Sequence, residues 1–321
     1  MPAPPADVAL DPQLVSRARG ALLGLVVGNQ LGAPTQGLES PGAIRAAFPE
    51  GVWDPAAPPA GSPYDDDAAL ALLCAESLLD RGDFDADDLA RRWAAWLARD
   101  GRGVGPATRI SLGLVAQGEG PFEAGRRAQQ QEPGHGLGGD CLARAVPLAL
   151  RFHGDPVRLA RAAAQQAAIT HADERAGAAA AALALATREL LVGNGFFIEE
   201  VRHRLNDAAP RAVLEALYRA AREGQADLPI AAPPEGGWAV GTLETAIWFA
   251  THDRSLEDAL VYLAQAGGDT GTNAAVAGAL LGARDGEAGI PPQWIAGIPG
   301  VKGITRLADR LVEAGARERH P

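Results

Sequence analysis

The spacing of apolar residues constrains the fold of this chain more than any other feature. Ala and Leu recur three and four positions apart along most of the sequence, interleaved with Arg and Glu, which is the period of an amphipathic α-helix. Aromatic residues make up only 5% of the chain, and runs of β-branched residues are scarce. The sequence therefore predicts an all-α protein, compact and built as a single domain over residues 1–321, with a flexible N-terminal tail at 1–12.

The expected helices connect through short segments, so neighbouring helices should pack antiparallel. Several open with a proline in the first turn, a position where its missing N–H costs nothing. The Pro- and Gly-rich stretches 48–63 and 228–237 are predicted to be surface loops within the domain. Helices are predicted at 12–27, 67–81, 86–99, 106–117, 141–153, 156–169, 173–192, 198–206, 210–223, 243–250, 256–265, 272–283 and 305–316.

The charge balance excludes one class of partner. Lys and Arg number 29 against 40 Asp and Glu, a net charge of −11, so binding to nucleic acid through the bulk field is not expected. The most apolar stretch, 176–191, is interrupted by Arg188 and Glu189 and predicts a buried helix, not a membrane span. No signal peptide is recognisable at the start, and two cysteines are too few for a disulfide framework. A cytoplasmic location is therefore expected.

The segment 272–283 suits the middle of a helical bundle. Gly278 and Gly282 lie four positions apart and share a helix face with Ala274 and Ala275. Small residues at this spacing let two helix backbones approach closely. The segment is therefore predicted to be a central helix.

Three adjacent carboxylates, Asp65, Asp66 and Asp67, come directly before the apolar run AALALLCAESLL. At a helix N-terminus, carboxylates are stabilised by free N–H groups and by the positive end of the helix dipole. Their oxygens are also the ligands that Mg²⁺ and Mn²⁺ prefer. An acidic N-cap with solvated neighbours explains the same residues, so this motif alone leaves both interpretations open.

A second acidic loop, GGDTGTN, also precedes a predicted helix and contains Gly268, Asp269, Thr272 and Asn273. Its glycines allow a tight turn, while its polar side chains supply oxygens at the helix start. A Gly C-cap followed by an Asp or Thr N-cap is the simpler explanation. Two acidic, helix-initiating loops far apart in sequence are nevertheless the arrangement that a metal site in a bundle core uses.

A third loop, with Gly138, Gly139 and Asp140, is rich in glycine. It is not a Walker loop, because it lacks the GK[ST] ending and no strand precedes it. Its backbone N–H groups can bind a phosphate or a sugar, although a plain turn between helices fits equally well. His171 lies at the start of another helix, where a histidine is either structural or lines a ligand cleft.

Taken in order, these segments resemble the ADP-ribosylglycohydrolase family, metal-dependent all-helical hydrolases that remove ADP-ribose from proteins and related acceptors. The resemblance runs from about residue 17 to 294 and implies the orthogonal helical bundle of that family. It is carried by RARGALLGLVVGNQLGAPTQ, SPYDDDAALALLCAESLL, GVGPATRISL, GGDCLARAVPLAL, THADERAGAAAAALA, the segment from TLETAIWFATHD to GALLGARDG, and IPPQW.

The resemblance also implies a site with two divalent cations, Mg²⁺ or Mn²⁺, between a Thr-Asp-Asp triplet and an Asp-x-Asp-Thr segment. The implied metal ligands are Asp65, Asp66, Asp67, Asp269 and Thr272. The implied catalytic residues are Asp65, Asp66 and Gln36. The implied substrate-binding residues are Gly138, Gly139, Asp140, His171, Gly268 and Asn273.

Several positions depart from the family's pattern. Asp65 stands where the family has a threonine and Gly271 where it has a second aspartate, so the total charge of the ligand set is kept. Gln36 and Asn29 are amides where relatives carry acids, and an amide cannot act as a general base near neutral pH. Gly103 stands where relatives often have an aspartate.

The sequence thus predicts a metal-dependent hydrolase of an N- or O-glycosidic bond to ADP-ribose or a related riboside, with a small-molecule or ADP-ribosylated substrate. Its base would be a metal-bound hydroxide or a carboxylate such as Asp65. Two alternatives stay open. Because acids are missing at positions 29, 36 and 271, the chain can be a catalytically silent protein that binds ADP-ribose or a nucleotide. Because Asp140 repels phosphate unless it faces away or binds a cation, the chain can also be a hydrolase with a changed substrate. A pure scaffold is disfavoured, since it needs no Asp65.

Overall fold

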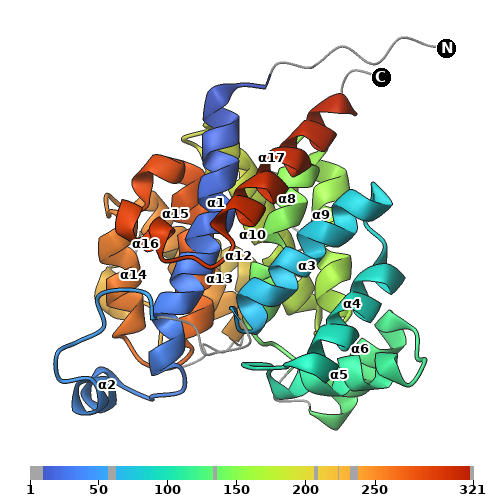
Figure 1. The fold of residues 1–321 in the computed structure, drawn as a ribbon, viewed down its shortest axis with the longest axis horizontal. Helices are drawn as coiled ribbons and strands as arrows, with labels where there is room; N and C mark the ends of the chain where they lie inside the picture. The colour runs from blue at the N-terminus through green and yellow to red at the C-terminus, as the bar shows by residue number, and fades with distance from the viewer. Residues whose placement is uncertain are drawn as a thin grey trace.

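The computed structural model describes residues 10–56, 63–132, 136–205, 209–222, 224–231 and 238–318. These residues form helices and turns and no strand, which confirms the all-α prediction (Figure 1). The helices are α1 (Pro12–Gly32), α2 (Pro41–Ala47), α3 (Asp66–Arg81), α4 (Ala86–Arg99), α5 (Pro106–Ala116), α6 (Pro121–Gln131), α7 (Asp140–Ala143), α8 (Val146–Arg151), α9 (Pro156–Ala168), α10 (Glu174–Leu191), α11 (Phe197–Leu205), α12 (Arg211–Ala220), α13 (Trp238–Thr251), α14 (Leu256–Ala264), α15 (Thr270–Asp285), α16 (Pro292–Ala296) and α17 (Val301–Arg317), with 3₁₀ turns η1 (Ala33–Thr35), η3 (Gln225–Asp227) and η4 (Glu287–Gly289).

Helices α1 and α15 form the most extensive helix contact among the described residues and cross the middle of the molecule side by side (Figure 1). They run antiparallel, and glycines spaced four apart bring their backbones together. A Cβ atom on Gly24 would lie 2.1 Å from the carbonyl oxygen of Gly278, and one on Gly282 would lie 2.0 Å from that of Gly20. The prediction that the small residues of α15 mark a central helix is therefore confirmed.

Apolar side chains from α1, α3, α4, α8, α10, α13, α15 and α17 join one hydrophobic core. One core is what a single domain requires, although the domain boundaries stay a prediction. The predicted tail lies mostly outside the described residues. Of it, Leu10 to Pro12 are described, and Asp11 accepts a hydrogen bond from the Gln13 N–H as the N-cap of α1. None of the helices in the described part of the chain is long and apolar enough to cross a membrane.

The structure corrects several helix boundaries. The predicted helix 141–153 is two helices, α7 and α8, because Pro147 has no N–H with which to continue the first one. Helix α1 continues to Gly32 instead of ending at residue 27, since its small residues pack on α15 to the end. Helices α2, α6 and α16 were not predicted, although each has a proline in its first turn. Helices α2 and α16 are short and α6, PFEAGRRAQQQ, is mostly polar, so each offers few apolar residues from which a period can be recognised.

Three helix starts, those of α3, α7 and α15, meet inside the bundle, where each of these helices contacts the other two. The acidic triplet, the glycine-rich loop and the second acidic loop lie directly before or at these starts. The fold therefore brings together the three motifs that the sequence singled out.

Candidate functional site

The acidic triplet lies at the start of α3. Asp65 is the N-cap residue, yet its side chain makes no capping hydrogen bond, and Asp66 and Asp67 are buried in the first turn. Each of the three side chains offers a carboxylate oxygen, and these oxygens all lie within 4.8 Å of one another. Oδ1 of Asp65 and Oδ1 of Asp67 are buried without a hydrogen-bond partner. Capping therefore does not account for this cluster, whose carboxylate oxygens could together hold a metal ion.

The charge of the triplet is not balanced within the protein. Burial raises the pKa of Asp65 to about 6, and Asn29 and Arg102 only partly oppose this rise. Burial, followed by repulsion from neighbouring carboxylates, raises the pKa of Asp66 and of Asp67 well above the ordinary value. A divalent cation among these oxygens reverses this effect by stabilising the charged carboxylates.

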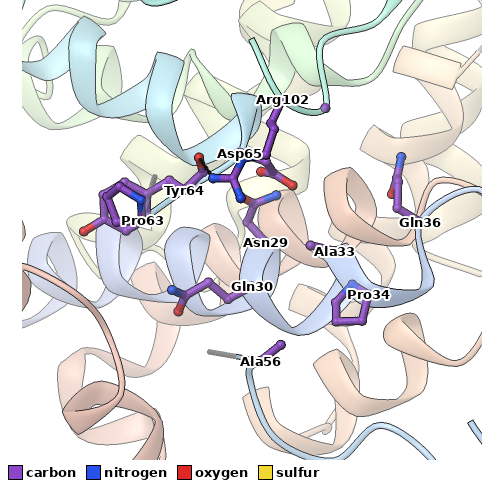
Figure 2. Close-up of a pocket in the computed structure, with 11 residues that line it drawn as sticks. Asn29, Gln30, Ala33, Pro34, Gln36, Ala56, Pro63, Tyr64, Asp65 and Arg102 are labelled. Carbon is purple, nitrogen blue, oxygen red and sulfur yellow. Dashed lines mark hydrogen bonds between the residues drawn. The ribbon is translucent and has the colours of Figure 1, made fainter. Parts of the chain in front are cut away.

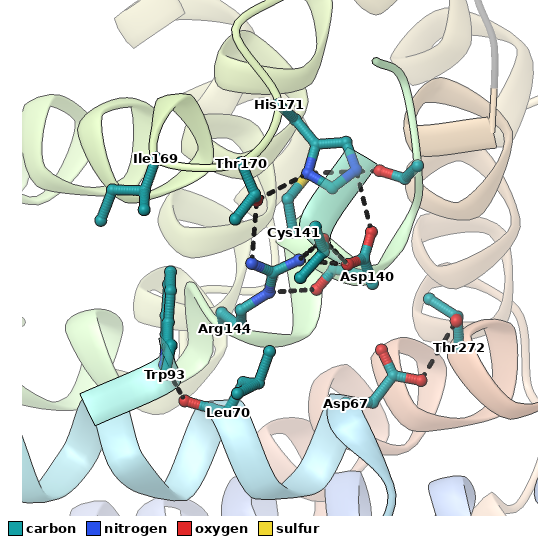
Figure 3. Close-up of polar contacts among 12 residues, drawn as sticks. Asp67, Leu70, Trp93, Asp140, Cys141, Arg144, Ile169, Thr170, His171 and Thr272 are labelled. Carbon is teal, nitrogen blue, oxygen red and sulfur yellow. Dashed lines mark hydrogen bonds and ion pairs between the residues drawn. The ribbon is translucent and has the colours of Figure 1, made fainter. Parts of the chain in front are cut away.

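Asp67 connects three helices. Its Oδ2 accepts one hydrogen bond from Nδ2 of Asn29 on α1, at 3.2 Å. It accepts another from Oγ1 of Thr272 on α15, at 3.1 Å (Figure 3). These contacts fix the orientation of the carboxylate and leave its second oxygen unpartnered. Oδ1 is therefore the oxygen of Asp67 that is available to a ligand.

Gln36 joins the early motif to the second acidic loop. Its Nε2 donates to Oδ1 of Asp269 at 2.5 Å, and its Oε1 accepts from the N–H of Gly271 at 2.6 Å. The backbones of the same two segments pair as well, because the Gly37 N–H donates to the Gly268 carbonyl at 3.0 Å. Burial raises the pKa of Asp269 despite the Gln36 contact.

Asp140 faces into the protein, where Arg144 neutralises it (Figure 3). Its Oδ2 accepts hydrogen bonds from the buried Arg144 guanidinium and, at 2.9 Å, from Oγ1 of Thr108. Nε2 of His171 lies 3.2 Å from its Oδ1, and Nδ1 of the same ring lies 2.8 Å from Oγ1 of Thr170. The carboxylate is therefore held from three sides, which answers the expectation that it repels phosphate unless it faces away.

The ionisation states of this group follow from its contacts. Burial disfavours the Asp140 carboxylate, but Arg144, His171 and Thr108 outweigh burial and hold its pKa below the ordinary value. Burial lowers the pKa of His171, and Arg144 lowers it further against the opposing effect of Asp140. A neutral His171 beside a charged Asp140 carries its proton on Nε2, so its Nδ1 accepts from the Thr170 hydroxyl.

A pocket of about 440 Å³ opens beside Asp65. Figure 2 shows Asn29 and Gln30 along one wall, on α1, and Tyr64, Asp65 and Arg102 along the other. Through Asp65 the triplet therefore borders an open space of the kind in which small ligands bind.

The model of the family described as ADP-ribosylglycohydrolase matches residues 10–321. The chain belongs to the ADP-ribosylglycohydrolase family. A solved structure, an ADP-ribosylglycohydrolase-related protein complex, is 31% identical with a TM-score of 0.73, over 94% of this chain and 99% of that one.

Curated relatives agree. The ADP-ribosylarginine hydrolase Tri1 of Pseudomonas putida is 27% identical over 94% of this chain and 79% of its own. The ADP-ribosyl-[dinitrogen reductase] glycohydrolase of Rhodospirillum rubrum is 27% identical over 88% of this chain and 90% of its own. The recognition of the family from sequence, and the fold it implies, are therefore confirmed.

Within this ADP-ribosylglycohydrolase fold, the structure brings the implied metal ligands to one place. Thr272 contacts Asp67 directly, and Asp269 lies close enough to raise the pKa of each carboxyl of the triplet. Gly103 lies against Asp66, whose Oδ1 would be 2.2 Å from a Cβ at position 103. An aspartate therefore does not fit at position 103 while Asp66 keeps this position.

The implied substrate-binding residues have different surroundings. Gly138 lies against His171, since a Cβ there would be 2.6 Å from Nε2 of the ring. Both ends of the Asn273 amide are used within the protein, one by the Thr242 hydroxyl at 2.8 Å and the other by the Ile230 carbonyl at 3.3 Å. Gly139 packs on the Thr242 hydroxyl, and Gly268 packs on Ala231. Asn273 thus positions a loop, and its role toward a substrate stays a prediction, as do the roles of the other implied site residues.

Sequence reasoning missed Arg144 and Thr108. Arg144 follows Asp140 by four residues, which is the spacing of an ion pair on a helix, and that spacing was visible in GGDCLARA. Its side chain is fully buried and lies over the Trp93 ring, 5.0 Å from the ring centroid. Thr108 gave no indication, because it comes from a different part of the chain.

Proposed function

We propose that the chain is a glycohydrolase that uses a divalent cation to cleave an N- or O-glycosidic bond to ADP-ribose or a related riboside. The observation that carries this proposal is the pair of buried, unpartnered carboxylate oxygens on Asp65 and Asp67, beside Asp269. It is supported by membership of a family whose relatives are named for ADP-ribosylarginine and for ADP-ribosyl dinitrogen reductase.

The donor set suits Mg²⁺ or Mn²⁺, because it consists of carboxylate oxygens alone. Asp65, Asp66 and Asp67 would hold the cation, Asp269 adds to the negative field, and Thr272 orients Asp67. The cation supplies Lewis-acid polarisation of the ribose oxygens. Asp65 also lines the pocket and is the carboxylate that takes up the proton from the attacking water, because Gln36 has no basic atom.

The chain binds one cation rather than the two that the family resemblance implies. The Nε2 donor of Gln36 occupies Oδ1 of Asp269, where a second cation would bind, and Gly271 has no carboxylate to offer. Native mass spectrometry with Mn²⁺ should therefore find one ion per chain in the wild type. The double variant Gln36→Glu/Gly271→Asp should bind two. Two ions in the wild type would contradict this assignment.

The function is tested by calorimetric titration of ADP-ribose, once with excess Mg²⁺ and once after chelation, together with an assay for ADP-ribose release from ADP-ribosylated proteins. Binding should need Mg²⁺. The variant Asp66→Asn should lose both cation binding and turnover, whereas Asp87→Asn, at an exposed position in α4, should keep both. Full turnover by Asp66→Asn would overturn the proposal.

A second candidate is a protein that binds ADP-ribose without cleaving it. It is favoured by Gln36, which stands where some relatives use a glutamate and is locked between Asp269 and Gly271. Tight, Mg²⁺-dependent binding with no product after long incubation would establish this function instead.

A further inference from the structure

A glutamine with unused hydrogen-bonding groups borders the pocket beside Asp65. Gln30 on α1 is 7% exposed, and neither its Nε2 nor its Oε1 has a hydrogen-bond partner. Its amide extends from α1 toward the Tyr64 and Pro63 side of the pocket (Figure 2). Leaving a buried amide unpaired is unfavourable. A group that pairs with this amide would remove that cost.

The remaining walls indicate what kind of group fits. Ala33, Pro34 and Pro63 give the pocket apolar surfaces. Two charged side chains, Asp65 and Arg102, also line it, and Nε of Arg102 lies 3.4 Å from a carboxylate oxygen of Asp100. Arg102 is fixed at the rim, because its Nη2 donates to the Tyr64 carbonyl at 2.8 Å. The apolar walls favour a flat group that packs against them.

The amide of Gln30 narrows this choice further. It presents an N–H donor beside a carbonyl acceptor, and the complement is a group with an acceptor beside a donor. Carboxamides have this pattern, as do the lactam edges of heterocycles. A guanidinium does not, because it carries donors only. A site with a buried polar pair discriminates strongly against ligands that leave one partner unpaired.

The position of the pocket determines which part of a substrate enters it. Asp65 belongs both to the pocket and to the acidic triplet, and Gly103 borders the pocket and Asp66. Asp140 and His171 do not line the pocket. A group in the pocket therefore lies next to the proposed reaction centre and outside the Gly138 to Asp140 loop, which is where a leaving group belongs.

We infer that this pocket binds the leaving group of the substrate, and that the leaving group is uncharged and planar with a carboxamide or lactam edge that pairs with Gln30. The inference rests on the proposed function, because it assigns a leaving group to that reaction. It distinguishes this chain from an enzyme built for a cationic arginine side chain.

The test uses nicotinamide as a carboxamide probe and ethylguanidine as a cationic probe, in saturation-transfer NMR on the full chain with Mg²⁺. Nicotinamide should bind saturably, and ethylguanidine should not. Gln30→Met, which keeps the side-chain length, should weaken nicotinamide at least tenfold. Gln117→Met, at an exposed residue that ends α5, is the matched control and should leave binding unchanged.

Thermal unfolding separates a binding role from a structural one. Gln30→Met removes an unpaired buried amide, so the variant should be at least as stable as the wild type. Unchanged nicotinamide affinity in this folded variant, or saturable binding of ethylguanidine instead, would overturn the inference. If ADP-ribose binds in calorimetry and nicotinamide does not, the pocket assignment fails alone. If nicotinamide binding depends on Gln30 but ADP-ribose does not bind, the proposed function fails instead.

Discussion

The contact between α1 and α15 makes a sharp prediction for Gly24→Ala. Ordinary van der Waals contact begins near 3.4 Å, and the new Cβ would lie 2.1 Å from the Gly278 carbonyl oxygen, so the two backbones must separate by 1.3 Å. Neither atom belongs to a side chain that can rotate away. Gly20 and Gly282 touch in the same way one turn along, so their contact opens as well.

The magnitude follows from two opposing effects. Overpacking of this kind costs about 3 kcal/mol, the upper end of the usual range, because backbone meets backbone. Alanine gains about 1 kcal/mol over glycine in helix propensity. The free energy of unfolding should therefore fall by about 2 kcal/mol, which lowers Tm by about 4 °C at roughly 2 °C per kcal/mol for a chain of this size.

Gly113→Ala is the matched control. Gly113 lies inside α5, and a Cβ there meets no atom within 4 Å. Only the propensity gain applies, so the free energy of unfolding should rise by about 1 kcal/mol. Urea unfolding followed by circular dichroism compares both variants with the wild type. If Gly24→Ala unfolds at or above the wild-type urea concentration, the reasoning about backbone contact is wrong.

Three further predictions concern the polar groups around α3 and α7. Arg144→Met should cost about 3–5 kcal/mol in urea unfolding, because it leaves the buried Asp140 carboxylate without its cationic partner. In the wild type the lowered pKa of Asp140 adds stability above its ordinary value of 3.8, and this stability is lost as the pH falls. In Arg144→Met only His171 and Thr108 oppose burial, so this gain in stability with rising pH should shrink or reverse. Mg²⁺ at about 100 times its Kd should raise the free energy of unfolding by about 2.7 kcal/mol. Asp67→Asn should abolish this increment. An equal increment in the variant would mean that the cation binds elsewhere. Gly103→Ala should weaken Mn²⁺ binding in an EPR titration by about tenfold, or ~1.4 kcal/mol. The new Cβ would displace Asp66, and the φ of +77° at position 103 strains any residue other than glycine. Unchanged Mn²⁺ affinity would contradict the close contact between positions 103 and 66.

Local information predicted the fold well. The segment 86–99 was assigned with its true ends, because Asp85 caps it and its apolar face is regular. The family resemblance supplied the arrangement of the helices, which no local pattern could give. The break at Pro147 was visible in the sequence, but the apolar period continued across it and dominated the prediction.

The site was only partly predictable. Asp65 to Asp67 are adjacent in the chain and precede a helix, so their common position could be anticipated. The Gln36 bridge to Asp269 joins residues that are 233 positions apart, and no sequence pattern marks such a contact. The unpaired amide of Gln30 was equally invisible, because whether a polar side chain finds a partner depends on what the fold places around it.

The glycine contact between α1 and α15 also fixes the register of the two helices. The glycines recur every four residues. The next register in which the two helices could pack as closely is therefore reached by sliding one helix about 6 Å along the other. Such a slide would separate Asn29 on α1 from Thr272 on α15. Both residues donate a hydrogen bond to Asp67, so one of these bonds would be lost. The glycine contact fixes the position of each side chain on the two helices but does not determine which residue type stands there. Side chains on the loops next to α1 and α15 can therefore differ without loss of this alignment, whereas a single inserted residue within either helix would destroy it.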